Sequence, residues 1–270
     1  MFGADRMANR DAGRSNGRGK RSAAVRWIPV LAAAAACGIV WQATAALAGL
    51  PAFILPGPWT VANRLVEVIR DGSLLRHTLH TSGEVVTGMA LGVGSAALLG
   101  YLLSKSHLAE RILSPYIVAT QAIPVVAVAP LLFIWLGGGF FSKVLICALI
   151  VFFPVLVNTV VGLRSVSSNL RELMLSLGAT RWQSVRLLEL PAALPVLLGG
   201  LKVGATLSVI GAVVGEFVAP DRGLGFLISV ARGQYDTALV FVGVFSLVAL
   251  ALALYALVAW AEKRYLAWRE

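Results

Sequence analysis

Three side chains with metal-binding chemistry lie at helical spacing near the start of an apolar stretch. His77, His80 and Glu84 are three and four residues apart, which places them on one face of a helix. Imidazole and carboxylate groups are zinc ligands, so one interpretation of this face is a metal site. The other is structural, with interfacial histidines and with Glu84 in an interhelical hydrogen bond or ion pair. We favour the second and expect neither a metal site nor catalytic residues.

Three further polar side chains interrupt apolar stretches. Ionisable groups in a bilayer are costly, so they are functional candidates by default. Lys202 either pairs with a carboxylate or lines the path of an anion. Glu216 either stabilises an outer gate, contacts a docked partner or is an ordinary interfacial carboxylate. Gln121 hydrogen-bonds either a substrate or a neighbouring helix, and we assign all three to a substrate path or gate.

One segment of the sequence partly resembles a P-loop, the phosphate-binding motif of many ATPases. Residues 17–22 read Gly-Arg-Gly-Lys-Arg-Ser, whereas a P-loop needs Gly, four residues and then Gly-Lys-Ser/Thr. Arg14 stands at the first glycine position and Arg21 follows the lysine. We therefore expect no ATP hydrolysis by this chain.

Composition indicates that these groups are positioned by membrane helices. The 270 residues are 58% hydrophobic and only 13% charged, against about 25% in soluble domains. The net charge of +10 is concentrated at the N-terminus, where seven of the 23 basic residues precede residue 27. This placement favours a tail next to a membrane span over a nucleic-acid surface, and we expect no nucleic-acid partner.

Six segments are long and apolar enough to cross a bilayer, which takes about 20 residues. They are residues 27–47, 78–103, 115–136, 144–163, 192–218 and 238–260. The predicted fold is therefore all-α and membrane-integral. A cleaved signal peptide is the alternative for the first segment, but the basic region is long and we favour an uncleaved span.

Basic residues predict the orientation of these spans. With the N-terminus inside, the inner segments hold sixteen Lys and Arg residues and the outer segments, in which we place Lys143, hold six. The positive-inside rule therefore places both termini in the cytoplasm. Apolar residues at helical spacing between Trp59 and Asp71 also predict an amphipathic helix on the outer surface.

The loop at residues 165–191 is long and well patterned. Asn169 and Glu172 are spaced to cap one short helix, and Thr180 and Gln183 a second, which we expect Pro191 to end. Gly178 lies between them and predicts a sharp turn. By pattern alone this helix–turn–helix is either an amphipathic linker on lipid or a docking site for another protein.

The same loop resembles the EAA loop of permease subunits in bacterial ABC importers that use a binding protein. The family pattern is Glu-Ala-Ala, three residues, Gly, nine residues, Ile, one residue, Leu-Pro. Glu172, Gly178, Leu190 and Pro191 match it, whereas Leu173, Met174 and Leu188 replace the two alanines and the isoleucine. Residues 121–137, 178–195 and 210–218 resemble the branch that imports nitrate, alkanesulfonates, taurine or thiamine pyrimidine precursors.

The resemblance implies a type I importer permease whose loop is a coupling helix docked on a separate ATPase, which holds the ATP and Mg²⁺. The implied coupling residues are Glu172, Leu173, Ser176, Gly178, Ala179, Thr180, Arg181 and Trp182. The implied partners are that ATPase, a periplasmic or lipid-anchored solute-binding protein and a second permease copy, in a bacterial inner membrane. This chain would carry no cofactor.

The predicted organisation has five parts. These are a basic tail at 1–26, a first span and turn at 27–58, an external amphipathic segment at 59–76, a permease core at 77–260 and a tail at 261–270. The competing hypotheses are an ion-gradient-driven secondary transporter, for which we find no internal repeat, and a membrane-embedded enzyme.

Overall fold

The computed structural model describes residues 18–47, 49 and 51–266, and the regular elements of this part are helices. The helices are α2 (Arg18–Leu47), α3 (Pro58–Arg70), α4 (Ser73–Lys105), α5 (His107–Gln121), α6 (Val125–Leu136), α7 (Phe140–Arg164), α8 (Ser168–Ser176), α9 (Arg181–Ser184), the π-helical turn η1 (Val185–Glu189), α10 (Leu190–Val218), α11 (Leu224–Gly233) and α12 (Thr237–Tyr265). The chain forms two compact units, residues 1–63 and 64–270.

The first unit contains α2 and the turn that follows it. The predicted first span, 27–47, lies within α2, which begins nine residues earlier at Arg18. Its apolar part, Ala32–Leu47, is shorter than the spans of the second unit. After the helix, the Trp41 indole nitrogen donates a hydrogen bond to the Pro56 carbonyl at 3.1 Å. Residues 1–17 of the predicted basic tail lie outside the described residues.

The second unit contains helices that are long and apolar enough to cross a membrane. Four pass this test: α4, α7, the continuous helix Arg181–Val218 and α12. The pair α5 and α6 adds a fifth if it is counted as one span. Each of the predicted segments from residue 78 onward coincides with one of these elements, and the predicted amphipathic segment forms α3.

The segment 115–136 is broken, which corrects its prediction as one span. Helix α5 ends at Gln121, α6 begins at Val125, and their axes differ by 92°. The cause is Pro124, which has no N–H to donate and disfavours helical backbone at Ile123. Pro124 has extended backbone angles and serves as the N-cap of α6.

Close helix packing forms the core of the second unit. Helix α7 packs against both α4 and α10. A Cβ added at Gly92 of α4 would lie 2.6 Å from the Ala148 carbonyl oxygen, and one at Gly211 of α10 would lie 2.8 Å from the Cys147 Cα. These glycines allow the backbones to approach directly, as small residues do between membrane helices.

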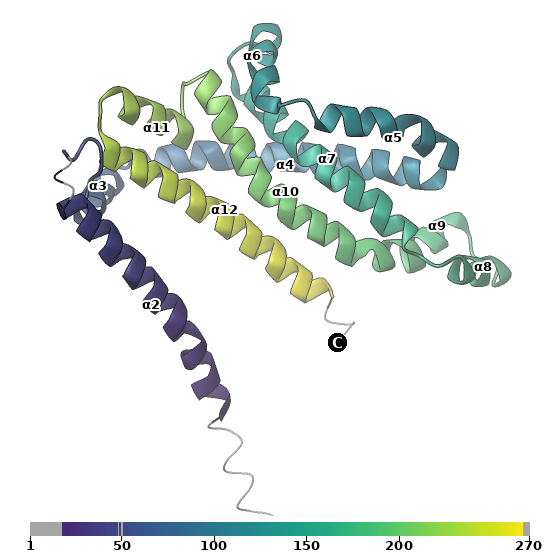
Figure 1. The fold of residues 1–270 in the computed structure, drawn as a ribbon. Coiled ribbons are helices and arrows are strands. Elements are labelled where there is room, and N and C mark those ends of the chain that lie inside the picture. Colours follow the sequence, from purple (N-terminus) through teal and green to yellow (C-terminus); the bar gives the residue numbers. More distant parts are fainter. Residues whose placement is uncertain (1–17, 48, 50, 267–270) are drawn as a thin grey trace, which may run out of the picture. The chain divides into compact units, whose positions relative to one another are not determined.

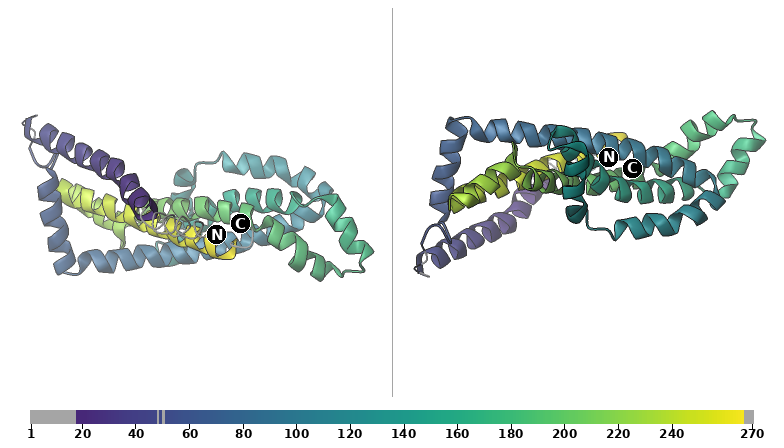
Figure 2. Two further views of the ribbon diagram at one scale, coloured as in Figure 1. Left: turned by 90° about the horizontal axis from the view of Figure 1, so that it is seen from below. Right: turned by 90° about the horizontal axis from the view of Figure 1, so that it is seen from above.

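Two functional regions lie at opposite ends of the second unit. Figures 1 and 2 show α8 and α9 at one end and α11 at the other. Helix α4 runs between these ends, because its first turns contact the segment before α11 and its last residue, Lys105, contacts η1. The same helix therefore forms part of both regions.

Candidate functional site

The loop between α7 and α10 folds as two short helices joined at a glycine. Helix α8 ends at Ser176 and α9 begins at Arg181. Gly178 has a φ of +71°, a left-handed conformation that favours glycine. The Ala179 N–H then donates to the Met174 carbonyl at 3.0 Å, which closes the end of α8. The predicted glycine turn is confirmed.

The caps of these helices agree with the prediction in one case and correct it in the other. Thr180 and Gln183 form the predicted capping box, in which each side chain accepts a hydrogen bond from the other residue's backbone. The N-cap of α8 is Ser167, whose hydroxyl accepts from the Leu170 N–H. The prediction of Asn169 as the cap was wrong, because Asn169 already lies inside the helix.

Pro191 does not end a helix as predicted. The chain continues from α9 through η1 into α10, and Pro191 lies in the first turn of α10. The Leu190 N–H bonds to the Val185 carbonyl five residues earlier, so the turn is wider than an α-helical one. A π-helical turn just before the proline loosens the backbone where its ring would otherwise crowd the preceding turn.

The two short helices expose an apolar surface. Leu175, Leu177 and Trp182 have exposed fractions of 70%, 72% and 70%. Glu172 is also exposed, and α8 has no buried residue. Large apolar side chains gathered on a protruding segment are typical of a surface that another molecule covers. The residues predicted for coupling all lie on this segment.

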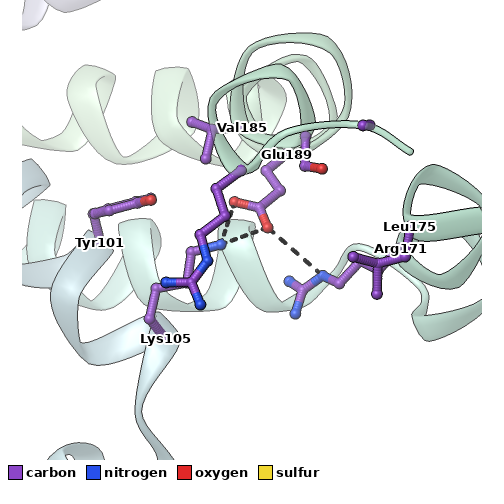
Figure 3. Close-up of a pocket in the computed structure, with 9 residues that line it drawn as sticks. Tyr101, Lys105, Arg171, Leu175, Val185 and Glu189 are labelled. Carbon is purple, nitrogen blue, oxygen red and sulfur yellow. Dashed lines mark hydrogen bonds and ion pairs between the residues drawn. The ribbon is translucent and has the colours of Figure 1, made fainter. Parts of the chain in front are cut away.

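A buried carboxylate joins the loop to the spans. Glu189 is 4% exposed, and both of its carboxylate oxygens lie 2.6 Å from the Lys105 ammonium. Arg171 of α8 approaches the same carboxylate, with its Nε 3.9 Å from Oε1. Figure 3 shows Glu189 pointing between these two cations, which come from different helices. Glu189 and Lys105 were not identified as functional candidates from the sequence. The available signal was the position of Glu189 between two apolar residues, Leu188 and Leu190, which indicates a buried carboxylate.

A second buried polar cluster lies at the other end of the unit. Glu84, Lys143 and Glu216 come from α4, α7 and α10, and all three are 0% exposed. The Lys143 ammonium lies 3.4 Å from Glu84 and also pairs with Asp221. Lys143 was predicted in an outer loop; this was wrong, because it lies in the first turn of α7. Its carboxylate partners supply the compensation that a buried ammonium requires.

Hydrogen bonds attach the N-terminal end of α11 to this cluster. The Gly225 N–H donates to the Glu216 carboxylate, which also accepts from the Thr81 hydroxyl at 2.6 Å. Thr81 in turn accepts from the Leu224 N–H at 2.8 Å, and His77 Nδ1 accepts from the Gly223 N–H at 3.1 Å. The location of Glu216 is thus that of a structural link between α4, α10 and α11.

Three residues in or beside this cluster have side chains close enough together to bind one metal ion. Among the described residues, His80, Glu84 and Glu216 offer ligand atoms within 4.8 Å of one another. The Glu84 oxygen that is 3.2 Å from His80 Nδ1 is also 3.4 Å from the Lys143 ammonium. Lys143 therefore supplies the positive charge that a cation would supply, and a bound metal would be repelled by it.

The remaining predicted path residues lie apart from each other. Gln121 is at the end of α5 and lines a 230 Å³ cavity whose walls are mostly apolar. Lys202 of α10 pairs with Glu262 of α12 and lies 6.0 Å from the Tyr255 ring centroid. Of the two interpretations of Lys202, the structure therefore supports pairing with a carboxylate.

Comparisons with known proteins agree with this arrangement. Residues 88–267 match the family described as "Binding-protein-dependent transport system inner membrane component". A riboflavin transport system permease protein of Chloroflexus aurantiacus is 48% identical over 230 residues, 85% of this chain and 86% of the relative. A formylaminopyrimidine transport permease protein of Halalkalibacterium halodurans is 34% identical over 86% of this chain and 92% of the relative. A putative aliphatic sulfonates transport permease protein of Bacillus subtilis is 32% identical over 90% and 88%.

A solved structure has the same fold. The crystal structure of an amino acid ABC transporter with histidines superposes with a TM-score of 0.59 at 19% identity, over 74% of this chain and 97% of that one. The type I permease fold that the resemblance implied is confirmed. The chain belongs to the binding-protein-dependent transport system inner membrane components, and it is a permease subunit of an ABC transport system.

Proposed function

We propose that this chain is half of the membrane pore of an importer, moved by a separate ATPase that docks on α8, Gly178 and α9. The observation that carries this proposal is the exposed apolar surface of that loop, at Leu175, Leu177 and Trp182. The loop leads without interruption into α10, so a displacement of the loop rotates or tilts a span. The second partner is a solute-binding protein on the opposite membrane face.

The orientation that this function requires is supported by charge. The loop would be cytoplasmic, with both termini, in a bacterial inner membrane. Sixteen basic residues fall in the inner segments and six in the outer ones, and this asymmetry supports the orientation.

We propose that two copies of the chain form the pore, with the solute path between them. The exposed surface of α5 and α6 supports this arrangement: Tyr116, Ile134 and Trp135 are 68%, 76% and 70% exposed. The cavity beside Gln121 opens next to α5, where a second copy would complete it. One copy thus supplies half of the lining.

For the solute we propose riboflavin. The support is the 48% identity with the riboflavin permease over most of both chains, above the 30–34% of the pyrimidine, sulfonate and taurine permeases. Side-chain chemistry agrees, because a sulfonate or nitrate path would benefit from an unpaired cation. Lys202, the candidate for that role, is already paired with Glu262. The cavity beside Gln121 is lined mostly by apolar groups, which suit a heteroaromatic ring.

The test is uptake in a riboflavin-auxotrophic bacterium without its own riboflavin transporter. The permease is expressed with its ATPase and its binding protein, and accumulation of radiolabelled riboflavin is measured. Excess taurine, an alkanesulfonate, nitrate and a formylaminopyrimidine serve as competitors. We expect uptake that unlabelled riboflavin alone inhibits. Absence of riboflavin uptake, together with accumulation of a radiolabelled formylaminopyrimidine or sulfonate in the same cells, would reassign the solute.

A second arm separates the energy source from the solute. Replacement of the P-loop lysine of the ATPase should abolish uptake, because this chain has no nucleotide-binding motif of its own. Uptake that persists in that variant and collapses with a protonophore would instead support an ion-driven secondary transporter.

A further inference from the structure

A cavity of about 410 Å³ separates the loop helices from the end of α4. This volume is in the range of small-ligand pockets, roughly 300–1,000 Å³. Three helical segments line it: the end of α4, helix α8, and α9 with η1. The lining residues are Tyr101, Lys105, Arg171, Leu175, Ala179, Arg181, Ser184, Val185 and Glu189.

The lining carries two positive charges in excess. Three cations face one carboxylate, and the hydrogen bonds of Glu189 are directed to Lys105. Arg171 donates from Nη2 to the Leu163 carbonyl at 2.7 Å, while its Nε is buried without a hydrogen-bond partner. Arg181 is exposed and forms no ion pair within the described part of the chain. Two guanidinium groups are therefore left with donors to spare.

The rest of the lining makes the cavity amphipathic. Ser184 adds a hydroxyl to the lining, whereas Tyr101, Leu175 and Val185 add aromatic and aliphatic surface. Figure 3 shows Tyr101 and Val185 on one side of Glu189 and Arg171 on the other. Arginine forks and a hydroxyl group are donors typical of phosphate sites. A phosphate dianion would balance the excess charge.

We propose that this cavity binds a phosphate group, held by Arg171, Arg181 and Ser184, and that the bound group fastens the coupling loop to the end of α4. The cytoplasmic placement of the site rests on the proposed function. Two sources share this chemistry on that face: the headgroup of an anionic phospholipid, which basic pockets at helix ends bind, and a soluble phosphate. The apolar side chains of the lining fit the acyl-linked end of a headgroup and also fit the organic part of a phosphate ester.

The test measures binding to the purified transporter with its ATPase, so that it does not depend on the transported solute. Delipidated protein is incubated either with radiolabelled orthophosphate, followed by equilibrium dialysis, or with phosphatidylglycerol, followed by native mass spectrometry. The variant is Arg181→Gln, because this exposed side chain can be changed without unfolding the core. The matched control is Arg186→Gln, which removes an exposed arginine five residues away that does not line the cavity.

We expect saturable binding in wild type and in Arg186→Gln, about tenfold to a hundredfold weaker binding in Arg181→Gln, and an intermediate value in Arg181→Lys. Retained phosphatidylglycerol that orthophosphate does not displace identifies the lipid as the source. Orthophosphate binding without lipid identifies a soluble phosphate.

Three results would overturn the proposal. They are no binding of either probe to wild type, equal losses in Arg181→Gln and Arg186→Gln, and loss of ATPase copurification in Arg181→Gln with unchanged phosphate binding. The last would mean that Arg181 pairs with an acidic side chain of the partner. Failed riboflavin uptake with intact phosphate binding would refute the solute proposal alone.

Discussion

Removal of the Lys143 ammonium should destabilise the permease far more than removal of another ion-paired lysine. Lys143 is 0% exposed and lies 3.4 Å from Glu84, which is also 0% exposed. Lys143→Met removes the ammonium paired with Glu84, and the His80 imidazole at 3.2 Å is the remaining ion-pair partner of this carboxylate among the described residues. Breaking a buried pair in this way costs about 3–5 kcal/mol. Lys202 and Glu262 are 21% and 25% exposed, so Lys202→Met should cost less than Lys143→Met, because the carboxylate that it leaves is partly accessible.

The assay is equilibrium unfolding of the purified permease in mixed micelles, titrated with a denaturing detergent and followed by tryptophan fluorescence. The double variant Lys143→Met/Glu84→Gln should recover at least half of the loss, because the glutamine carries no buried charge. Equal destabilisation by Lys143→Met and Lys202→Met would refute the reasoning. So would a double variant no more stable than Lys143→Met, since the loss would then come from packing.

The remaining predictions concern backbone geometry and pH. Gly178→Val should abolish coupled transport without affecting membrane insertion, because a φ of +71° costs a β-branched residue about 1–2 kcal/mol. Gly178→Asn should retain most of the transport activity, since asparagine tolerates this conformation. Equal uptake by the two variants would contradict this prediction. Gly92→Val should lower the free energy of unfolding by about 1–3 kcal/mol or more, since its Cβ would meet the Ala148 carbonyl oxygen. Gly94→Val is the control in the same unfolding assay, because a Cβ at Gly94 meets nothing within 4 Å. Burial by itself raises the pKa of Asp221, but the hydrogen bond and charge of Lys143 outweigh it and hold that pKa below the ordinary 3.8. The stabilisation by Asp221 is therefore present above pH 3.8 and lost as pH falls through the lower folded-state value, and Asp221→Asn should remove this part of the pH dependence.

The conformation of the loop at residues 165–191 was partly predictable because the signals of its glycine turn and its second N-cap are local. A positive φ at Gly178 and a capping box at Thr180 and Gln183 depend on neighbouring backbone groups, which sequence spacing specifies. The end of the second helix was not predictable in this way. Whether a proline ends a helix depends on the turn before it, and the π-helical turn at η1 allows Pro191 to continue into α10.

An ion pair was predicted as one interpretation for Glu84 and for Lys202, but the partners were not predictable because they lie far apart in sequence. Lys105 and Glu189 are 84 residues apart, and neither belongs to a local sequence pattern that indicates an ion pair. Lys143 was counted as a loop residue because it precedes an apolar run by one position. Burial decided its role, since only the packing of α4 and α10 against α7 brings carboxylates to it.

The sequence by itself determined that the chain is helical and apolar enough for a membrane and where the loop with the glycine turn lies, because hydropathy and turn chemistry act over a few neighbouring residues. The tertiary structure decided which charges are buried together, how the 115–136 segment bends and what the loop contacts. These properties depend on helices that meet through close backbone approach, as at Gly92 and Gly211, and no local pattern specifies which helix lies opposite.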